Sequence, residues 1–271
     1  MSKERRNLLF AITLSVFPLG QCFPADASDN PESGQTGRYT YSGSMIEILG
    51  ADGAAAYSPV FPVDQAQHWE IVVPEDYDPN DPPGILVYIS PSDSGKIPRN
   101  WTSSIETENL IWIAAKRSGN KRAVARRIAY SILAAGIIDR RYKVNASRIY
   151  LAGFSGGAKV AGLVAALYPN LFSGAIYIGG AELWDEETAT VDIDAIQRNR
   201  YVFMAGTDDF NRPLSRKVFS KYTDLGIENI EFVVMTGKGH QLPETRQFTR
   251  ALQFLDGSQP PESGRIGTPI I

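Results

Sequence analysis

The sequence predicts an α/β fold, a three-layer α/β/α sandwich built around a mostly parallel sheet. Short apolar runs such as GILVYI at residues 84–89 are typical of strands that are buried on both faces. Stretches with helical periodicity lie between these runs, as at 121–142, where apolar residues recur every three or four positions. Because these connections are too long for hairpins, we expect parallel pairing through right-handed crossovers.

The expected elements alternate along the chain. The first strand covers 68–73 and ends at Pro74. A helix is expected to begin at Pro213 and to stop at Gly226, since proline favours the first helical turn and glycine the position past the end. The other expected strands are 84–89, 110–115, 148–152, 175–178, 201–205 and 230–235, and the other expected helices are 121–142, 158–167 and a last one ending near 255.

Composition limits the classes of function. A chain of 271 residues with 43% apolar and 21% charged residues can bury one substantial core, which excludes general disorder. Its net charge of -3 provides no broad positive field, so we expect no nucleic-acid binding. One cysteine and two histidines exclude an intramolecular disulfide and the usual zinc ligand sets, and we expect no metal or cofactor.

The first 27 residues read as an export signal. A cationic start at 3–6 and an apolar run at 8–17 precede Ala25-Asp26-Ala27, whose small residues suit signal peptidase. The run is too short to remain as a membrane span. We therefore expect an exported protein, periplasmic or secreted. The alternatives are a frayed start of a cytosolic protein, or a lipid anchor at Cys22, which is the weaker option because Gln21 precedes it.

The rest of the chain divides into three parts. Residues 28–38 are polar and rich in Gly, Pro and Ser, which predicts a flexible N-terminal segment. One domain is expected over 39–257, followed by an irregular tail at 258–271. Between the strands at 175–178 and 201–205 only about 20 residues are available, too few for a helical cap, so we expect a minimal cap or none.

The main chemical signal is Gly153-Phe154-Ser155-Gly156-Gly157, a G-x-S-x-G motif. It directly follows an apolar strand and directly precedes an Ala- and Gly-rich helix, the setting in which this motif presents a nucleophilic serine. A phosphate-binding loop or a plain turn is the alternative. The phosphate-loop ending is absent, however, and Lys159 falls inside the expected helix.

A serine hydroxyl needs a base, and only His240 follows Ser155 in the chain. It lies in a glycine-bearing loop after the strand at 230–235, whereas His68 starts an early strand and is expected to be structural. The acid that orients the imidazole is expected between the two. Asp209, at the fourth position of a Gly-x-x-Asp turn, is preferred to its neighbour Asp208. The acidic residues of the connector, Asp185, Asp192 and Asp194, are read as solvated charges.

With these segments the chain resembles the α/β-hydrolase superfamily, and within it the secreted esterase and polyhydroxybutyrate-depolymerase-like group. The resemblance rests on the strand and turn at 149–157, the acid turn at 206–209 and the histidine loop at 237–240. It implies an α/β-hydrolase fold and an acyl-enzyme mechanism on small-molecule or polymeric carboxylic esters. Ser155 would be the nucleophile, His240 the base and then the acid, and Asp209 its partner.

The resemblance also implies an oxyanion hole, formed by the Gly156 N–H and one N–H from the loop after Ile89. Esterases of this kind often carry His-Gly at that loop, whereas this chain has Ser-Pro-Ser-Asp at 90–93. Pro91 has no N–H, so Ser92 is the nearest donor. This departure motivates a second hypothesis, a non-catalytic binding protein on the same scaffold. An acyltransferase is a third.

Several residues are weaker candidates for substrate contact. The segment 118–120 follows a strand and reads as a substrate-contacting loop or an ordinary turn. The segment 182–185 could edge a pocket. Three tryptophans could line the site, although packing in the core is the more usual role of this residue: Trp101, Trp112 and Trp184.

Overall fold

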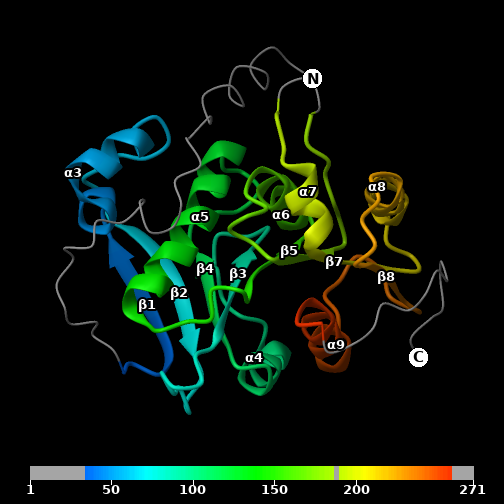
Figure 1. The fold of residues 1–271 in the computed structure, drawn as a ribbon, viewed down its shortest axis with the longest axis horizontal. Helices are drawn as coiled ribbons and strands as arrows, with labels where there is room; N and C mark the ends of the chain where they lie inside the picture. The colour runs from blue at the N-terminus through cyan, green and yellow to red at the C-terminus, as the bar shows by residue number, and fades with distance from the viewer. Residues whose placement is uncertain (1–33, 186–188, 258–271) are drawn as a thin grey trace.

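The computed structural model describes residues 34–185 and 189–257. These residues form an eight-stranded sheet with helices on both faces, which confirms the predicted three-layer sandwich (Figure 1). The predicted export signal at 1–27, most of the predicted flexible segment and the predicted tail at 258–271 lie outside the described residues. None of the helices within the described ranges is both long and apolar enough to cross a bilayer.

The sheet has the strand order β1-β2-β4-β3-β5-β6-β7-β8. All pairs from β4 through β8 are parallel, and the pairs β1–β2 and β2–β4 are antiparallel. The strands are β1 (Gly37–Gly43), β2 (Gln67–Val73), β3 (Gly84–Ile89), β4 (Leu110–Ala115), β5 (Ile149–Phe154), β6 (Gly174–Ile178), β7 (Arg200–Gly206) and β8 (Ile230–Met235).

Strand β1 was not predicted, and it begins two residues inside the segment expected to be flexible. Its exposure alternates along the strand because β1 is an edge strand with one face toward the protein. Its polar half therefore resembles a loop in the sequence, and the pairing of Tyr39 with Ile71 and of Tyr41 with Trp69 holds it in the sheet.

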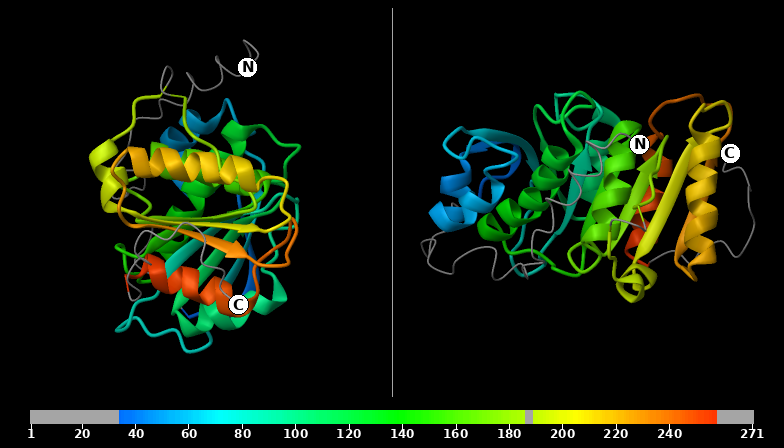
Figure 2. Two further views of the ribbon diagram at one scale, coloured as in Figure 1. Left: turned by 90° about the vertical axis from the view of Figure 1, so that its right-hand side faces the viewer. Right: turned by 90° about the horizontal axis from the view of Figure 1, so that it is seen from above.

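The helices divide between the two faces of the sheet, as Figure 2 shows. Helices α5, α6 and α8 pack on one face, and α4 and α9 pack on the other. The helices are α3 (Met45–Tyr57), the 3-10 turn η1 (Arg99–Trp101), α4 (Thr102–Thr107), α5 (Val124–Arg141), α6 (Gly156–Leu167), α7 (Ile193–Arg198), α8 (Arg212–Asp224) and α9 (Thr245–Leu255).

Helix α3 was not predicted from the sequence either. Its start has a local signal, a capping box in which the Ser44 side chain accepts the Glu47 N–H and the Glu47 carboxylate accepts the Ser44 N–H. Its interior does not read as one helix, because Gly50 has a φ of 73° and kinks the chain there. The expected helices at 121–142, 158–167 and 213–226 correspond to α5, α6 and α8.

The sheet separates two apolar cores. In β3, Ile85, Val87 and Ile89 belong to the core under α5 and α6, and Leu86 and Tyr88 to the core under α4 and α9. All five side chains are at most 5% exposed. Burial of both faces explains why the central strands read as continuous apolar runs.

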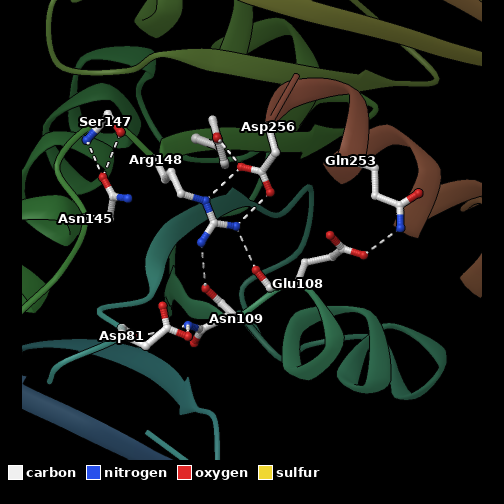
Figure 3. A network of polar contacts seen from close by, with 9 residues as sticks. Asp81, Glu108, Asn109, Asn145, Ser147, Arg148, Gln253 and Asp256 are labelled. Atoms are coloured by element: carbon white, nitrogen blue, oxygen red, sulfur yellow. Dashed lines mark hydrogen bonds and ion pairs between the residues drawn. The ribbon is translucent and has the colours of Figure 1, made fainter. Parts of the chain in front are cut away.

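A network of polar contacts lies at the amino ends of β4 and β5 (Figure 3). The Arg148 guanidinium makes two bonds to the Asp256 carboxylate, Nε to Oδ1 at 2.8 Å and Nη2 to Oδ2 at 2.7 Å. It also donates to the carbonyls of Glu108 and Asn109. The Tyr150 hydroxyl donates to the same carboxylate. This network ties the end of α9 to the starts of two central strands.

Replacing Asp256 with alanine is expected to lower the free energy of unfolding by about 2–4 kcal/mol, because a largely buried guanidinium loses its counter-ion. Urea unfolding followed by circular dichroism measures the change. Asp224→Ala is the matched control. That carboxylate is exposed at the end of α8 and has no hydrogen bond or ion pair within the described chain. We expect it to change stability by less than about 0.5 kcal/mol. Equal losses in both variants would contradict the role given to the network.

Candidate active site

Ser155 lies at the sharp turn between β5 and α6, with φ 55° and ψ -121°. A non-glycine residue adopts this backbone only under strain, and such strain is common at active sites. The turn also needs glycine on both sides. A Cβ at Gly157 would collide with the Ile89 carbonyl, and one at Gly153 would lie 2.5 Å from the Gly157 carbonyl oxygen. The close approach of these backbones explains the spacing of the motif.

The structure brings Ser155, His240 and Asp209 into one hydrogen-bonded chain. The Ser155 Oγ lies 2.9 Å from His240 Nε2, and His240 Nδ1 lies 3.0 and 3.1 Å from the two Asp209 carboxylate oxygens. The Asp209 side chain is fully buried, whereas the His240 side chain is 19% exposed. The hydroxyl and the imidazole are 85 residues apart in sequence, so the fold alone assembles this arrangement.

The neighbouring carboxylate takes no part in this chain. Asp208 is exposed, and its backbone N–H donates to the Lys238 carbonyl, which fastens the acid turn to the histidine loop. The Asp209 carboxylate is held from its own turn, because its Oδ1 accepts the Asn211 N–H at 2.8 Å. The Asn211 side chain in turn donates to the Gly179 carbonyl at 2.9 Å. Sequence reasoning missed Asn211, although an Asp-x-Asn spacing is a recognisable turn signal.

Two phenylalanines flank the imidazole. The Phe154 ring stacks on His240 with centroids 4.9 Å apart, and the Phe210 ring lies 4.4 Å away. Phe210 is 73% exposed, unlike almost every other large apolar side chain of the described chain. Sequence reasoning assigned neither ring a role. The exposed face of Phe210 gives the site an apolar surface beside its histidine.

The region expected to hold a substrate oxygen lies between α6 and the loops after β3 and β4. Gly156 begins α6, so its N–H has no carbonyl partner within the helix. The Ser92 N–H, expected as the second donor, donates to the Ser90 Oγ at 3.1 Å. A substrate oxygen would have to compete for that donor. The side-chain amide of Asn120 lies against the Gly156 Cα, in the space that a Cβ there would take.

The loops after β3 and β4 are bonded to each other. The Asn120 N–H donates to the Pro91 carbonyl at 2.9 Å, and the Gly119 N–H donates to the Asp93 carboxylate at 2.7 Å. Hydrogen bonds from the Gly119 N–H and then from Arg122 hold the pKa of Asp93 below its ordinary value, against the opposing effect of burial. The segment 118–120 therefore lies at the candidate site, where its interpretation as a substrate-contacting loop would place it.

The remaining candidates lie elsewhere or in the core. Trp101 and Trp112 are fully buried and Trp184 is 7% exposed, which supports core packing. His68 lies in β2, where its Nδ1 is 2.7 Å from the Ser42 Oγ, and β4 and β3 separate it from β5. Asp192 is exposed, in agreement with its interpretation as a solvated charge, and it also caps α7 by accepting the Ala195 N–H. Across residues 34–185 and 189–257 no group of three His, Cys, Asp or Glu side chains is arranged to hold a metal ion.

No family model and no curated protein matches the chain in sequence. Solved structures match its fold. The S-formylglutathione hydrolase FrmB from Staphylococcus aureus is 14% identical in sequence. The match covers 80% of this chain and 97% of the FrmB chain, with a TM-score of 0.56. The feruloyl esterase module from Clostridium thermocellum is 12% identical, with coverages of 84% and 90% and a TM-score of 0.56.

Larger proteins contain the same fold. Dipeptidyl peptidase 4 from Porphyromonas gingivalis is 18% identical over 72% of this chain, with a TM-score of 0.53. The chain spans 34% of the length of that peptidase and 37% of a putative dipeptidyl aminopeptidase IV from Bacteroides ovatus. The eight-stranded sheet and its flanking helices are those of the α/β-hydrolase fold. The predicted fold is therefore confirmed.

Proposed function

We propose that the protein is a serine hydrolase that cleaves carboxylic esters through an acyl-enzyme on Ser155. The observation that carries the proposal is the hydrogen-bonded chain from Ser155 through His240 to the buried Asp209. Hydrolase and esterase structures with the same fold support it. With its Nδ1 proton donated to Asp209, the imidazole presents an unprotonated Nε2 to the serine hydroxyl.

The first half of the reaction forms the acyl-enzyme. The Ser155 Oγ bonds to the ester carbonyl carbon while His240 Nε2 takes the hydroxyl proton, and the carbonyl electron pair moves onto its oxygen. The Gly156 N–H and the positive end of α6 stabilise that oxyanion. When the carbonyl reforms, the bond to the alcohol oxygen breaks and the alcohol leaves with the His240 proton.

The second half repeats these steps with water. The water oxygen attacks the acyl carbon while His240 takes a proton from that water. His240 then returns the proton to the Ser155 Oγ as the carboxylic acid leaves. The apolar face of Phe210, exposed beside His240, suits an ester with an apolar acyl or alcohol group. Export to the periplasm or medium, with removal of 1–27, completes the proposal and rests on the sequence alone.

A panel of p-nitrophenyl esters of rising acyl length tests this proposal against its alternatives. We expect saturable release of nitrophenol. A binding protein would bind the esters without turnover. An acyltransferase would convert them faster when an alcohol acceptor is added and would yield the new ester in place of the acid. Absence of any turnover by folded protein would contradict the hydrolase assignment.

The two adjacent carboxylates make a matched pair for identifying the acid. Asp209→Asn is expected to lower kcat by on the order of 10³ to 10⁴, because an amide no longer favours the Nδ1–H tautomer or the imidazolium. Asp208→Asn is expected to stay within about twofold, since that side chain is exposed and outside the chain of bonds. Steady-state kinetics on one ester measures both. Two small losses would place the acid elsewhere.

A further inference from the structure

A buried arginine lies beneath the proposed substrate-oxygen site. Arg127, in α5, is 3% exposed, and its guanidinium donates to three backbone carbonyls. Nε donates to Ser118 at 2.8 Å, Nη2 to Ser90 at 3.0 Å and Nη1 to Gly156 at 3.1 Å. These carbonyls belong to the loop after β4, the loop after β3 and the first turn of α6. One planar side chain therefore joins the three segments that surround the oxyanion region.

The charge of this side chain is unusual for its position. Burial lowers the pKa of Arg127 to about 10, opposed by the attraction of Asp93, so the guanidinium stays cationic at neutral pH. Among the described residues no carboxylate forms an ion pair with Arg127, and Asp93 pairs with Arg122. A buried cation without a counter-ion is costly to stability. Such a cost is common where a group serves function rather than folding.

Each of the three carbonyls lies close in sequence to a group of the proposed oxyanion region. The Gly156 carbonyl and the proposed donor N–H belong to one residue. The Ser90 carbonyl is two residues before Ser92, and the Ser118 carbonyl is two residues before Asn120, whose amide lies against Gly156. Donors in an oxyanion hole are effective only when their positions are fixed before charge develops. Arg127 fixes the backbone from which all of these groups project.

We propose that Arg127 is a positioning residue for the reaction, which holds the loops after β3 and β4 against the first turn of α6 and so preorganises the oxyanion hole. The inference rests on the proposed esterase function. It predicts that loss of the guanidinium weakens stabilisation of the transition state more than binding of the substrate. A role confined to folding would instead lower the fraction of active protein and leave the remaining molecules with normal kinetics.

The test compares Arg127→Ala with Arg126→Ala on one p-nitrophenyl ester. Arg126 is the next residue of α5, and its guanidinium bonds to Gln67 and Tyr130, away from the site. For Arg127→Ala we expect kcat to fall by on the order of 10² to 10³, as for loss of an oxyanion donor, with KM changed by less than about threefold. Guanidinium ion at millimolar concentration is expected to restore part of kcat along a saturation curve. Arg126→Ala should show neither effect.

A transition-state analogue gives a second readout. Inhibition by an alkyl boronic acid, which forms a tetrahedral adduct on a catalytic serine, should weaken by the same factor as kcat/KM falls. If Arg127→Ala does not fold, Arg127→Lys replaces it, because an ammonium keeps the charge but cannot bridge three carbonyls in one plane. We expect that variant to fold, with low kcat and near-normal KM.

Two results would overturn the inference. One is a folded Arg127→Ala, or a folded Arg127→Lys if the alanine variant does not fold, with kcat and boronic-acid affinity close to those of the wild-type protein. The other is activity loss that tracks the unfolded fraction, measured by circular dichroism on the same samples. Failure of the esterase proposal is distinguishable, because the wild-type protein itself would then turn over no ester and bind no boronic acid at the serine.

Discussion

Replacing Ser155 with alanine is expected to lower kcat/KM for p-nitrophenyl esters by on the order of 10⁴ to 10⁶, to a rate near that of the uncatalysed reaction. Alanine removes the atom that forms the acyl bond while keeping the backbone of the turn. The site would still bind an ester, so the loss should appear in kcat rather than in KM. Initial rates over a range of substrate concentrations measure both constants.

The control for this variant is another serine near the opposite end of β5. Ser147 is exposed, and its hydroxyl donates to the side chain of Asn145 within the turn before the strand. Ser147→Ala should keep kcat/KM within about twofold of the wild-type value. Turnover that survives in Ser155→Ala, in protein purified away from host esterases, would exclude Ser155 as the nucleophile.

Replacing His240 with alanine is expected to lower kcat by on the order of 10⁴ or more, because the Ser155 hydroxyl loses the group that accepts its proton at 2.9 Å. The oxyanion donors would remain, so a small residual rate above background should persist. The same ester assay measures this loss. It should appear at every pH from 6 to 9, since no other imidazole lies at the site.

The protein carries its own control for this change. His68 is the other histidine, and its Nδ1 is bonded to Ser42 in the β1–β2 pair. His68→Ala should change kcat by less than about threefold. Comparable losses in the two variants would mean that the effect comes from general instability, and would remove the assignment of His240 as the base.

The elements predicted from sequence were those whose signal is local. Strand β3 is buried on both faces and reads as an unbroken apolar run, and the turn at Ser155 needs glycines at fixed spacing because backbones pass beside them. The edge strand β1 was not predicted because its exposure alternates and its polar half resembles a loop, and helix α3 was not predicted because its pattern is interrupted at Gly50.

The candidate site shows the same division. Ser155, His240 and Asp209 could be selected from residue type, chain order and position after strands. Asn211 had a local signal in the Asp-x-Asn spacing that was not used. Arg127 could not be selected, because its contacts join segments that are distant in sequence. An arginine inside an apolar helix pattern resembles any surface arginine, and only the three carbonyls around Arg127 distinguish it.

The oxyanion region is where sequence reasoning was least complete. The Ser-Pro-Ser-Asp loop pointed to Ser92 as a donor, and its N–H is bonded to the Ser90 hydroxyl. Sequence alone gives no distance between the loops after β3 and β4, so the contact of the Asn120 amide with Gly156 was beyond it.

The central claim is that the Ser155 hydroxyl is a nucleophile activated by His240. A fluorophosphonate probe, which forms a phosphonate ester with an activated serine as fluoride leaves, tests it most directly through intact mass and peptide mapping. We expect one adduct per folded chain, on Ser155. It should be absent from heat-denatured protein and from Ser155→Ala, and its formation should be strongly slowed in His240→Ala. Folded protein that stays unmodified, or an adduct on any other residue, would contradict it.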